Sequence, residues 1–332
     1  MKNSFLKLLI PLVILAVLIG GIFAVSKLSE KTESKGEEVS TVIAAQTDTS
    51  TVTALNITFD KNTFGVAKNA KGQWQYIDDA AFPLSENKVN DLLTVLSSIE
   101  SSRIVNSNAS DTVQYGLSPA SVQVVAETED GESKAFKFGD ESSTGDVYFC
   151  TNGDKKVYLV DSSIKERFQT DIFDLAQIEN ICELNEIKSV EVKGEESDIC
   201  FTVSTKSKTD ETKVYKARSG EKEISVSESA GSEFIDSIKA LSFDSLVNYK
   251  GESEKYGLDS PAFTITLKGE KTDSDSKTVP AECSLLIGSK DDDGNYYACL
   301  KGSKNICLIS ADSLTDILVT DTASFTDTES NE

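Results

Sequence analysis

Carboxyl groups are the most abundant side chains of this sequence that could perform chemistry. The chain has 55 Asp and Glu residues against 33 Lys and Arg residues, which gives a formal net charge of −22 at pH 7. A pair of carboxyl groups at the right separation hydrolyses glycosidic bonds, one acting as general acid and the other as base or nucleophile. In a chain this acidic most carboxylates are solvated surface groups, so their abundance alone identifies no catalytic pair.

Most other chemistry is excluded by what the sequence lacks. It contains no His, which removes Ser–His and Cys–His catalytic pairs and zinc sites that use His ligands. It has no Walker loop, dinucleotide-binding fingerprint or nucleophile elbow. The negative charge repels nucleic acid, and no dense basic cluster opposes it. We therefore expect no enzyme, no catalytic residues, no cofactor and no nucleic-acid partner, and a small-molecule ligand stays unknown.

Two further groups of residues could bind a metal or form crosslinks. Asp291, Asp292 and Asp293 precede Gly294 as in a calcium loop, but Leu300 stands where such a loop needs its last glutamate, so a hairpin turn is expected. No metal site is predicted. The cysteines show neither a Cys-x-x-Cys pair nor metal-ligand spacing. We expect them to be free and buried, with disulfides as the alternative. They are Cys150, Cys182, Cys200, Cys283, Cys299 and Cys307.

A Tyr-Gly-Leu triplet occurs twice in the chain. Tyr115 begins the first copy and Tyr256 the second, 141 positions further on (256 − 115 = 141). In both copies apolar residues at helical spacing precede the triplet, and residues that alternate between apolar and polar, as in a half-buried strand, follow it. The chain is therefore predicted to be an internal duplication.

The matching positions of the two copies form a repeat motif that we interpret as structural. In this interpretation glycine supplies a backbone conformation with positive φ, leucine fills the core and proline stiffens the entry to the next strand. The alternative is that the two tyrosines project from their turns and contact a ligand or partner. The motif comprises Tyr115, Gly116, Leu117, Pro119, Gly139 and Tyr148 in the first copy and Tyr256, Gly257, Leu258, Pro261, Gly288 and Tyr297 in the second.

The elements that must hold these residues are mainly strands, with one long helix in each copy. The helical spacing falls on residues 92–99 and 234–241, and short helices are expected near residues 164–168 and 314–318. The order of elements predicts an α+β fold of two tandem repeats, each a mostly antiparallel β-sheet with one or two packed helices. We expect the first repeat over residues 54–180, the second over 181–325 and a disordered tail over 326–332.

The N-terminal residues have the pattern of a membrane anchor. Lys2 and Lys7 precede an uncharged run from Leu8 to Val25, which with Phe5 and Leu6 is long enough to cross a hydrocarbon core of about 30 Å. The lysines favour a cytoplasmic N-terminus, so residues 1–26 are interpreted as a cytoplasmic N-terminus and transmembrane helix that crosses the membrane through residues 5–25. The alternative is a cleaved signal peptide. Residues 27–53 are polar and are expected to form a flexible stalk.

Four segments carry a resemblance to a known family. They are the YGL at 115–117 with SPA after it, the YGLDSPAF from Tyr256 to Phe263, and the glycine-then-tyrosine segments FGDESSTGDVYF and IGSKDDDGNYY. With these the chain resembles the domain of unknown function 4340 family of bacterial membrane-tethered proteins. Pro119 comes one place earlier in its turn than Pro261, which departs from the family pattern in the first copy.

This resemblance implies a partner, because members of the family are often found beside ABC-type transporter components. We therefore expect a single-pass protein of the bacterial cell membrane whose C-terminal domain is extracytoplasmic. Its expected function is that of a non-catalytic interaction module, accessory to an ABC-type transporter or another envelope protein. The alternative is a cell-surface glycan-binding or carboxylate-dependent hydrolase domain, in which acidic side chains from both copies would line one cleft.

Overall fold

The computed structural model describes residues 42–195, 197–207, 209–319 and 322–325. The predicted membrane anchor, most of the predicted stalk and the predicted tail lie outside these residues. Within them, no helix combines the length and the apolar character needed to cross a membrane.

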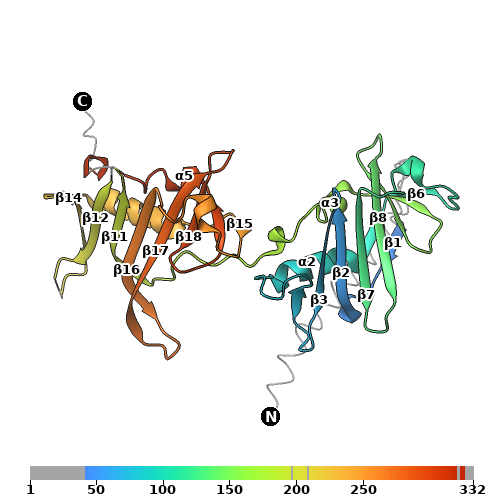
Figure 1. Cartoon of the computed structure of the whole chain (residues 1–332), viewed down its shortest axis with the longest axis horizontal. Coiled ribbons are helices and arrows are strands. Elements are labelled where there is room, and N and C mark those ends of the chain that lie inside the picture. The colour runs from blue at the N-terminus through green and yellow to red at the C-terminus, as the bar shows by residue number, and fades with distance from the viewer. Residues whose placement is uncertain (1–41, 196, 208, 320–321, 326–332) are drawn as a thin grey trace, which may run out of the picture. The chain divides into compact units, whose positions relative to one another are not determined.

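Two similar series of strands and helices follow one another along the chain (Figure 1). The first series is β1 (Val42–Gln46), η2 (Thr49–Thr51), β2 (Val52–Phe59), β3 (Asn62–Lys68), β4 (Trp74–Tyr76), α2 (Glu86–Ser97), β5 (Ser98–Ser101), β6 (Arg103–Asn106), η3 (Val113–Tyr115), β7 (Val122–Thr128), β8 (Ser133–Glu141), β9 (Val147–Thr151), β10 (Val157–Val160), α3 (Ser162–Glu166) and η4 (Phe173–Leu175). The second is β11 (Glu186–Gly194), β12 (Asp198–Thr205), β13 (Lys213–Ser219), β14 (Lys222–Val226), α4 (Glu228–Ala240), β15 (Ser245–Asn248), η5 (Ser253–Tyr256), β16 (Phe263–Thr272), β17 (Thr278–Lys290), β18 (Tyr296–Leu300), β19 (Ile306–Ile309), α5 (Ala311–Leu314) and η6 (Thr322–Phe325).

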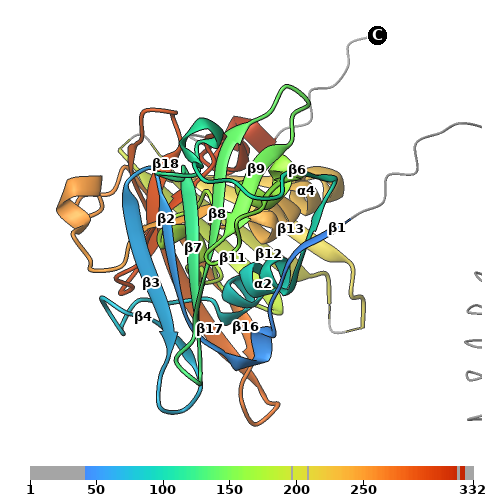
Figure 2. The ribbon, with the colours of Figure 1, turned by 90° about the vertical axis from the view of Figure 1, so that its right-hand side faces the viewer.

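Each series forms one large antiparallel sheet, and β1 and β5 of the first series form a separate two-stranded sheet. The strand order is β4-β3-β2-β7-β8-β9-β10-β6 in the first sheet and β14-β13-β12-β11-β16-β17-β18-β19-β15 in the second. Figure 2 shows the strands β3, β2, β7, β8 and β9 of the first sheet in this order. The two orders correspond strand for strand, except that β14 adds an edge strand to the second sheet. The predicted α+β fold of two mostly antiparallel repeats with few helices is confirmed for the described residues.

One face of each sheet is apolar because every second residue of its strands is apolar. In β7, Val122, Val124 and Ala126 are buried while the residues between them are half-buried or exposed. Helix α2 covers this face of the first sheet with Val89, Leu92, Leu93 and Leu96. Its first turn is capped by Ser85, whose hydroxyl accepts a hydrogen bond from the Lys88 amide.

The second sheet is covered in the same way by helix α4, drawn in gold in Figure 1. Phe234 of this helix packs on Phe201 of β12, with 4.6 Å between the ring centroids. Gly231 lets the helix approach the sheet closely, because a methyl group at this position would collide with the ring of Tyr215 in β13. The predicted helix positions, 92–99 and 234–241, therefore fall largely on α2 and α4, although both helices begin earlier.

Residues 42–53 differ from the flexible stalk that their composition indicates. β1 pairs antiparallel with β5 and lies against helix α2. Ala44, Ala45 and Val52 are buried, and β2 already begins at Val52. A few small apolar residues are enough to order this segment because they cover the edge of a core that α2 has already formed.

Side chains of the two repeats meet at Tyr249, which follows β15. The Tyr249 hydroxyl donates a hydrogen bond of 2.8 Å to Oδ2 of Asp79, and its ring packs edge-on against Phe82, with 5.0 Å between centroids. Lys250 Nζ lies 3.4 Å from the same carboxylate oxygen. Burial and the hydrogen bond to Asp79 raise the pKa of Tyr249. The second repeat thus contributes one ring to an aromatic cluster of the first.

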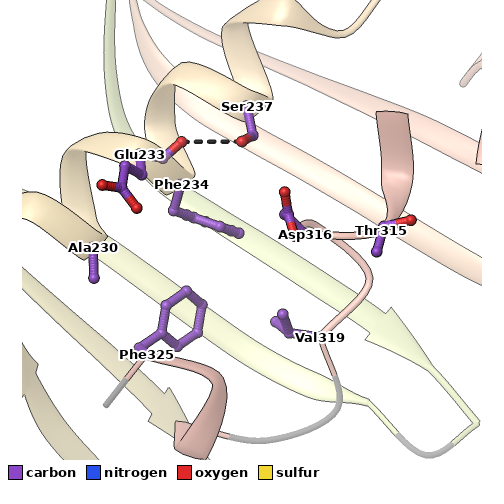
Figure 3. A pocket seen from close by; sticks show the side chains of 8 residues that line it. All are labelled: Ala230, Glu233, Phe234, Ser237, Thr315, Asp316, Val319 and Phe325. Atoms are coloured by element: carbon purple, nitrogen blue, oxygen red, sulfur yellow. Dashed lines mark hydrogen bonds between the residues drawn. The ribbon is translucent and has the colours of Figure 1, made fainter. Parts of the chain in front are cut away.

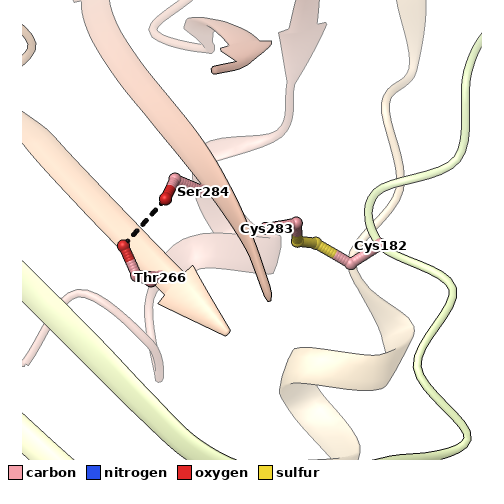
Figure 4. Close-up of a disulfide and its surroundings, with 4 residues drawn as sticks. All are labelled: Cys182, Thr266, Cys283 and Ser284. Carbon is pink, nitrogen blue, oxygen red and sulfur yellow. Dashed lines mark hydrogen bonds between the residues drawn. A yellow bond between two sulfur atoms is a disulfide. The ribbon is translucent and has the colours of Figure 1, made fainter. Parts of the chain in front are cut away.

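A disulfide joins Cys182, in the segment between the repeats, to Cys283 of β17 (Figure 4). The expectation that all six cysteines are free is therefore wrong for this pair. The reason is that Cys182 lies in a segment held beside the second sheet, where the Asn185 amide donates to the carbonyl oxygen of Glu270 at 2.8 Å. Cys182 has a φ of 60°, and its Cα lies 6.1 Å from that of Cys283. Among the others, Cys150, Cys299 and Cys307 are free and buried, and Cys200 is free and half-buried.

We expect the double variant Cys182→Ser/Cys283→Ser to lose about 4 kcal/mol of unfolding free energy, because the disulfide closes a loop of 101 residues and so restricts the unfolded chain. Chemical denaturation of the two proteins measures this difference, and Cys200→Ser, which removes a free thiol, is the control. Alkylation of the denatured, unreduced protein should modify the four free cysteines alone. Modification of all six would show that the disulfide is absent.

Candidate functional site

The tyrosines and leucines of the repeat motif come together in one small cluster in each repeat, whereas the two prolines lie outside the clusters. The cluster of the second repeat contains Tyr256, Leu258, Cys299, Ile306 and Tyr297, and that of the first contains Leu117, Cys150, Val157, Tyr115 and Tyr148. Leu286 and Cys299 of the second cluster are strand partners, whereas their neighbours Leu285, Ile287 and Ala298 belong to the main core that includes α4. Neighbouring residues of a strand point to opposite faces of the sheet. The clusters therefore lie on the sheet face opposite to the one that α2 and α4 cover.

In each cluster the Tyr-Gly-Leu turn lies directly on a strand glycine. Gly116 and Gly257 end the short helices η3 and η5 in the left-handed conformation, with φ of 65° and 71°. The turn then passes so close to the sheet that a methyl group at Gly139 would collide with the carbonyl oxygen of Tyr115. A methyl group at Gly288 would collide in the same way with that of Tyr256.

The two tyrosines of each cluster pack on one another. The ring centroids are 5.0 Å apart for Tyr115 and Tyr148 and 4.8 Å apart for Tyr256 and Tyr297. The Tyr115 hydroxyl accepts a hydrogen bond of 3.4 Å from Asn106. These contacts lie within the repeat and favour the structural interpretation of the motif, which stays a prediction.

The two prolines of the motif occupy different local structures. Pro119 follows a cis peptide bond with Ser118, and Pro261 lies two residues before β16 begins at Phe263. The displaced proline of the first copy therefore accompanies a turn that differs from that of the second copy.

A groove lies between the long helix and the segment after the closing helix in both repeats. In the first repeat it has a volume of about 510 Å³, and its lining includes Lys88, Asp91, Leu92 and Val95 of α2. In the second repeat it has a volume of about 390 Å³, and its lining includes Ala230, Glu233, Phe234 and Ser237 of α4 (Figure 3).

The two grooves are built from corresponding residues. Each of these four positions of α2 returns in α4 at the same offset, as from Lys88 to Ala230 (230 − 88 = 142). On the opposite wall, Arg167 and Thr170 of the first groove correspond to Asp316 and Val319 of the second (316 − 167 = 149). The groove was therefore duplicated with the repeat. No sequence motif marks the groove. Only a comparison of both helical segments of the first repeat with those of the second, at the offsets 142 and 149, would have indicated it.

Two of the charged groups of the first groove, Lys88 and Asp174, form hydrogen bonds within the groove. Lys88 Nζ donates a hydrogen bond of 2.8 Å to the carbonyl oxygen of Asp174. The Asp174 carboxylate accepts hydrogen bonds from the Thr170 hydroxyl at 3.1 Å and from the Asp171 amide at 3.0 Å. Charges of both signs therefore line this groove.

The second groove has an apolar floor and acidic walls. Phe234 and Phe325 form the floor, with their rings edge to face and 5.0 Å between centroids. Glu233 and Asp316 lie on either side of Phe234 in Figure 3. The Ser237 hydroxyl, also in the wall, donates to the main-chain oxygen of Glu233 at 3.1 Å. This arrangement can bind a ligand by contact and charge.

The carboxyl groups with a clearly shifted pKa do not have the properties of a general acid. Within the described residues their pKa values are all lowered, because neighbouring groups donate hydrogen bonds to the charged form, whereas a general acid needs a raised pKa. These groups are Asp48, Asp79, Asp130, Asp161, Glu186 and Asp210. In each groove the acidic side chains come from one repeat, so neither groove is the shared acidic cleft that the hydrolase alternative requires.

The triple aspartate forms a hairpin turn in the structure. Oδ1 of Asp291 accepts hydrogen bonds from the amides of Asp293 and Asn295, at 3.0 Å and 2.8 Å, which closes the connection between β17 and β18. Over the described part of the chain, no group of three or more acidic or cysteine side chains has a metal-binding arrangement.

Comparison with known proteins gives a family match that repeats along the chain. The model of the family described as "Domain of unknown function (DUF4340)" matches residues 74–247 and, separately, residues 218–329. The first match begins in β4 and the second in β13, which occupy corresponding places in the two sheets. Neither the curated proteins nor the solved structures gave a match.

We expect Gly288→Ala to lower the unfolding free energy by about 2 kcal/mol, because the added methyl group collides with a main-chain oxygen that cannot move without distorting the Tyr256 turn. The control is Ser289→Ala, which removes one hydrogen bond of 3.1 Å to the same oxygen and should cost about 1 kcal/mol. Urea denaturation compares the two variants. An equal or smaller loss for Gly288→Ala would show that the turn does not lie on this strand.

Proposed function

Since the chain belongs to the DUF4340 family, we propose that it is a non-catalytic interaction module that is anchored in the bacterial cell membrane and exposed outside the cytoplasm. Its proposed partner is an ABC-type transporter component or another envelope protein. The anchor is the apolar run within residues 5–25.

The observation that carries this proposal is the groove that both repeats share. Each groove is open, has apolar side chains at its base and is rimmed by polar and charged groups, which is the usual composition of a binding surface. Two such grooves in one chain allow a partner to be held at two points, so that the second contact forms at a high effective concentration. Binding of this kind needs no catalytic residues.

The disulfide supports the proposed compartment. Stable disulfides form outside the cytoplasm, where thiols are not kept reduced. The bond between Cys182 and Cys283 therefore agrees with a domain that is exported after synthesis.

Site-specific photo-crosslinking in the native membrane tests this function. A photoreactive residue is placed at Val95 in the first groove, at Ser237 in the second or at Thr202. Thr202 is the control because it is exposed on the sheet face opposite to α4. We expect crosslinks to the same envelope protein from Val95 and Ser237, identified by mass spectrometry, and none from Thr202.

Two outcomes would contradict the proposal. Identical crosslinked products from all three positions would mean that the grooves are not the binding surface. If crosslinking gave no protein product and the captured material were envelope glycan, the glycan-binding alternative would replace the interaction module.

A further inference from the structure

The two carboxylates of the second groove have no cationic partner among the described residues. Neither Glu233 nor Asp316 takes part in an ion pair there, and both side chains are exposed at the rim of the groove. The neighbouring Asp236 differs, because Lys239 Nζ lies 3.7 Å from its carboxylate. Two unpaired carboxylates on opposite walls of one groove give it a negative potential.

The segment that forms the wall opposite α4 adds negative charge and no positive charge. From Ala311 to the last residue, Glu332, the chain contains no Lys and no Arg, whereas it contains several Asp and Glu residues. The wall that carries Asp316 therefore has no basic residue of its own to neutralise it.

The floor between the carboxylates favours a long cationic side chain over a small ion. Phe234, Phe325 and Val319 line the base of the groove, where Phe234 and Phe325 are buried except for 5 % and 4 % of their surface. The aliphatic stem of Lys or Arg packs on such a surface while its charged head stays at the rim. A cation near an aromatic ring gains further attraction from the ring.

The first groove has the corresponding position in its repeat but lacks this preference for a cationic side chain. Its counterpart of Asp316 is Arg167, and its counterpart of Ala230 is Lys88, whose ammonium group already bonds within the groove. Two positions that are basic in one copy are thus acidic or neutral in the other, while the groove itself is kept. The copies differ in the charge of the walls and also in the floor, where Phe325 has no counterpart in the lining of the first groove.

We propose that the second groove binds a basic, amphipathic segment of a partner protein, with Lys or Arg groups against Glu233 and Asp316 and their aliphatic stems on Phe234 and Phe325. This assignment rests on the proposed function of the chain as an interaction module and gives the chemistry of its partner.

A peptide-binding experiment tests the charge preference on the full chain in detergent. The probe is a fluorescent peptide of alternating Lys and Leu residues, and a second peptide with Gln in place of every Lys keeps the apolar residues without the charge. We expect the double variant Glu233→Gln/Asp316→Asn to bind the Lys peptide about tenfold more weakly than the unchanged chain, because it removes two exposed charge contacts, each worth about threefold in affinity. Asp91→Asn, which changes the residue corresponding to Glu233 in the first groove, should alter the affinity by less than about twofold.

The results separate a specific site from general attraction to an acidic protein. Equal losses for the double variant and for Asp91→Asn, or equal affinity for the Lys and Gln peptides, would overturn the proposed specificity. Unchanged circular dichroism spectra establish that the variants are folded.

The same double variant, carrying the photoreactive residue at Ser237, links the peptide result to the native partner. We expect its crosslinked product to be strongly reduced while the product from Val95 in the first groove persists. An undiminished crosslink at Ser237 would refute the basic segment but leave the interaction module standing. The lack of any crosslink in the unchanged chain would instead remove the proposed function itself.

Discussion

Burial of one apolar sheet face beneath a single helix is the interaction on which both repeats depend. In the first repeat the sheet contributes alternating apolar residues, as in β7. In the second repeat helix α4 contributes Phe234, which packs on Phe201 of the sheet. A helix that lies across a sheet leaves space along its outer edge, and in both repeats the segment after the closing helix forms the second wall of that space. The grooves are therefore a direct product of the packing that stabilises the fold.

The sequence predicted the elements whose signals are local. The spacing of Leu92, Leu93 and Leu96 indicated α2, and the alternation in β7 and β16 indicated the strands, because each pattern reports the burial of one face of one element. The Tyr-Gly-Leu turns could be predicted from the sequence because glycine is required where a turn has positive φ or lies directly on a strand.

The features that the sequence did not predict depend on residues far apart in the chain. β1 is ordered by α2 and β5, and the disulfide joins residues separated by 101 positions. The groove arises between two helical segments that are unremarkable when each is considered alone. Its acidic character in the second repeat follows from single positions, such as Asp316 in place of Arg167, that have meaning only after the copies are superimposed.

The contact of Tyr249 with Phe82 and Asp79 has a consequence for the history of this chain. The ring that covers Phe82 of the first copy belongs to the second, so a chain reduced to the first copy would expose an aromatic surface to solvent. Loss of the second copy would therefore uncover part of this cluster, whereas changes in the grooves leave the contact in place. The contact thus constrains the chain to keep both copies but leaves their grooves free to differ.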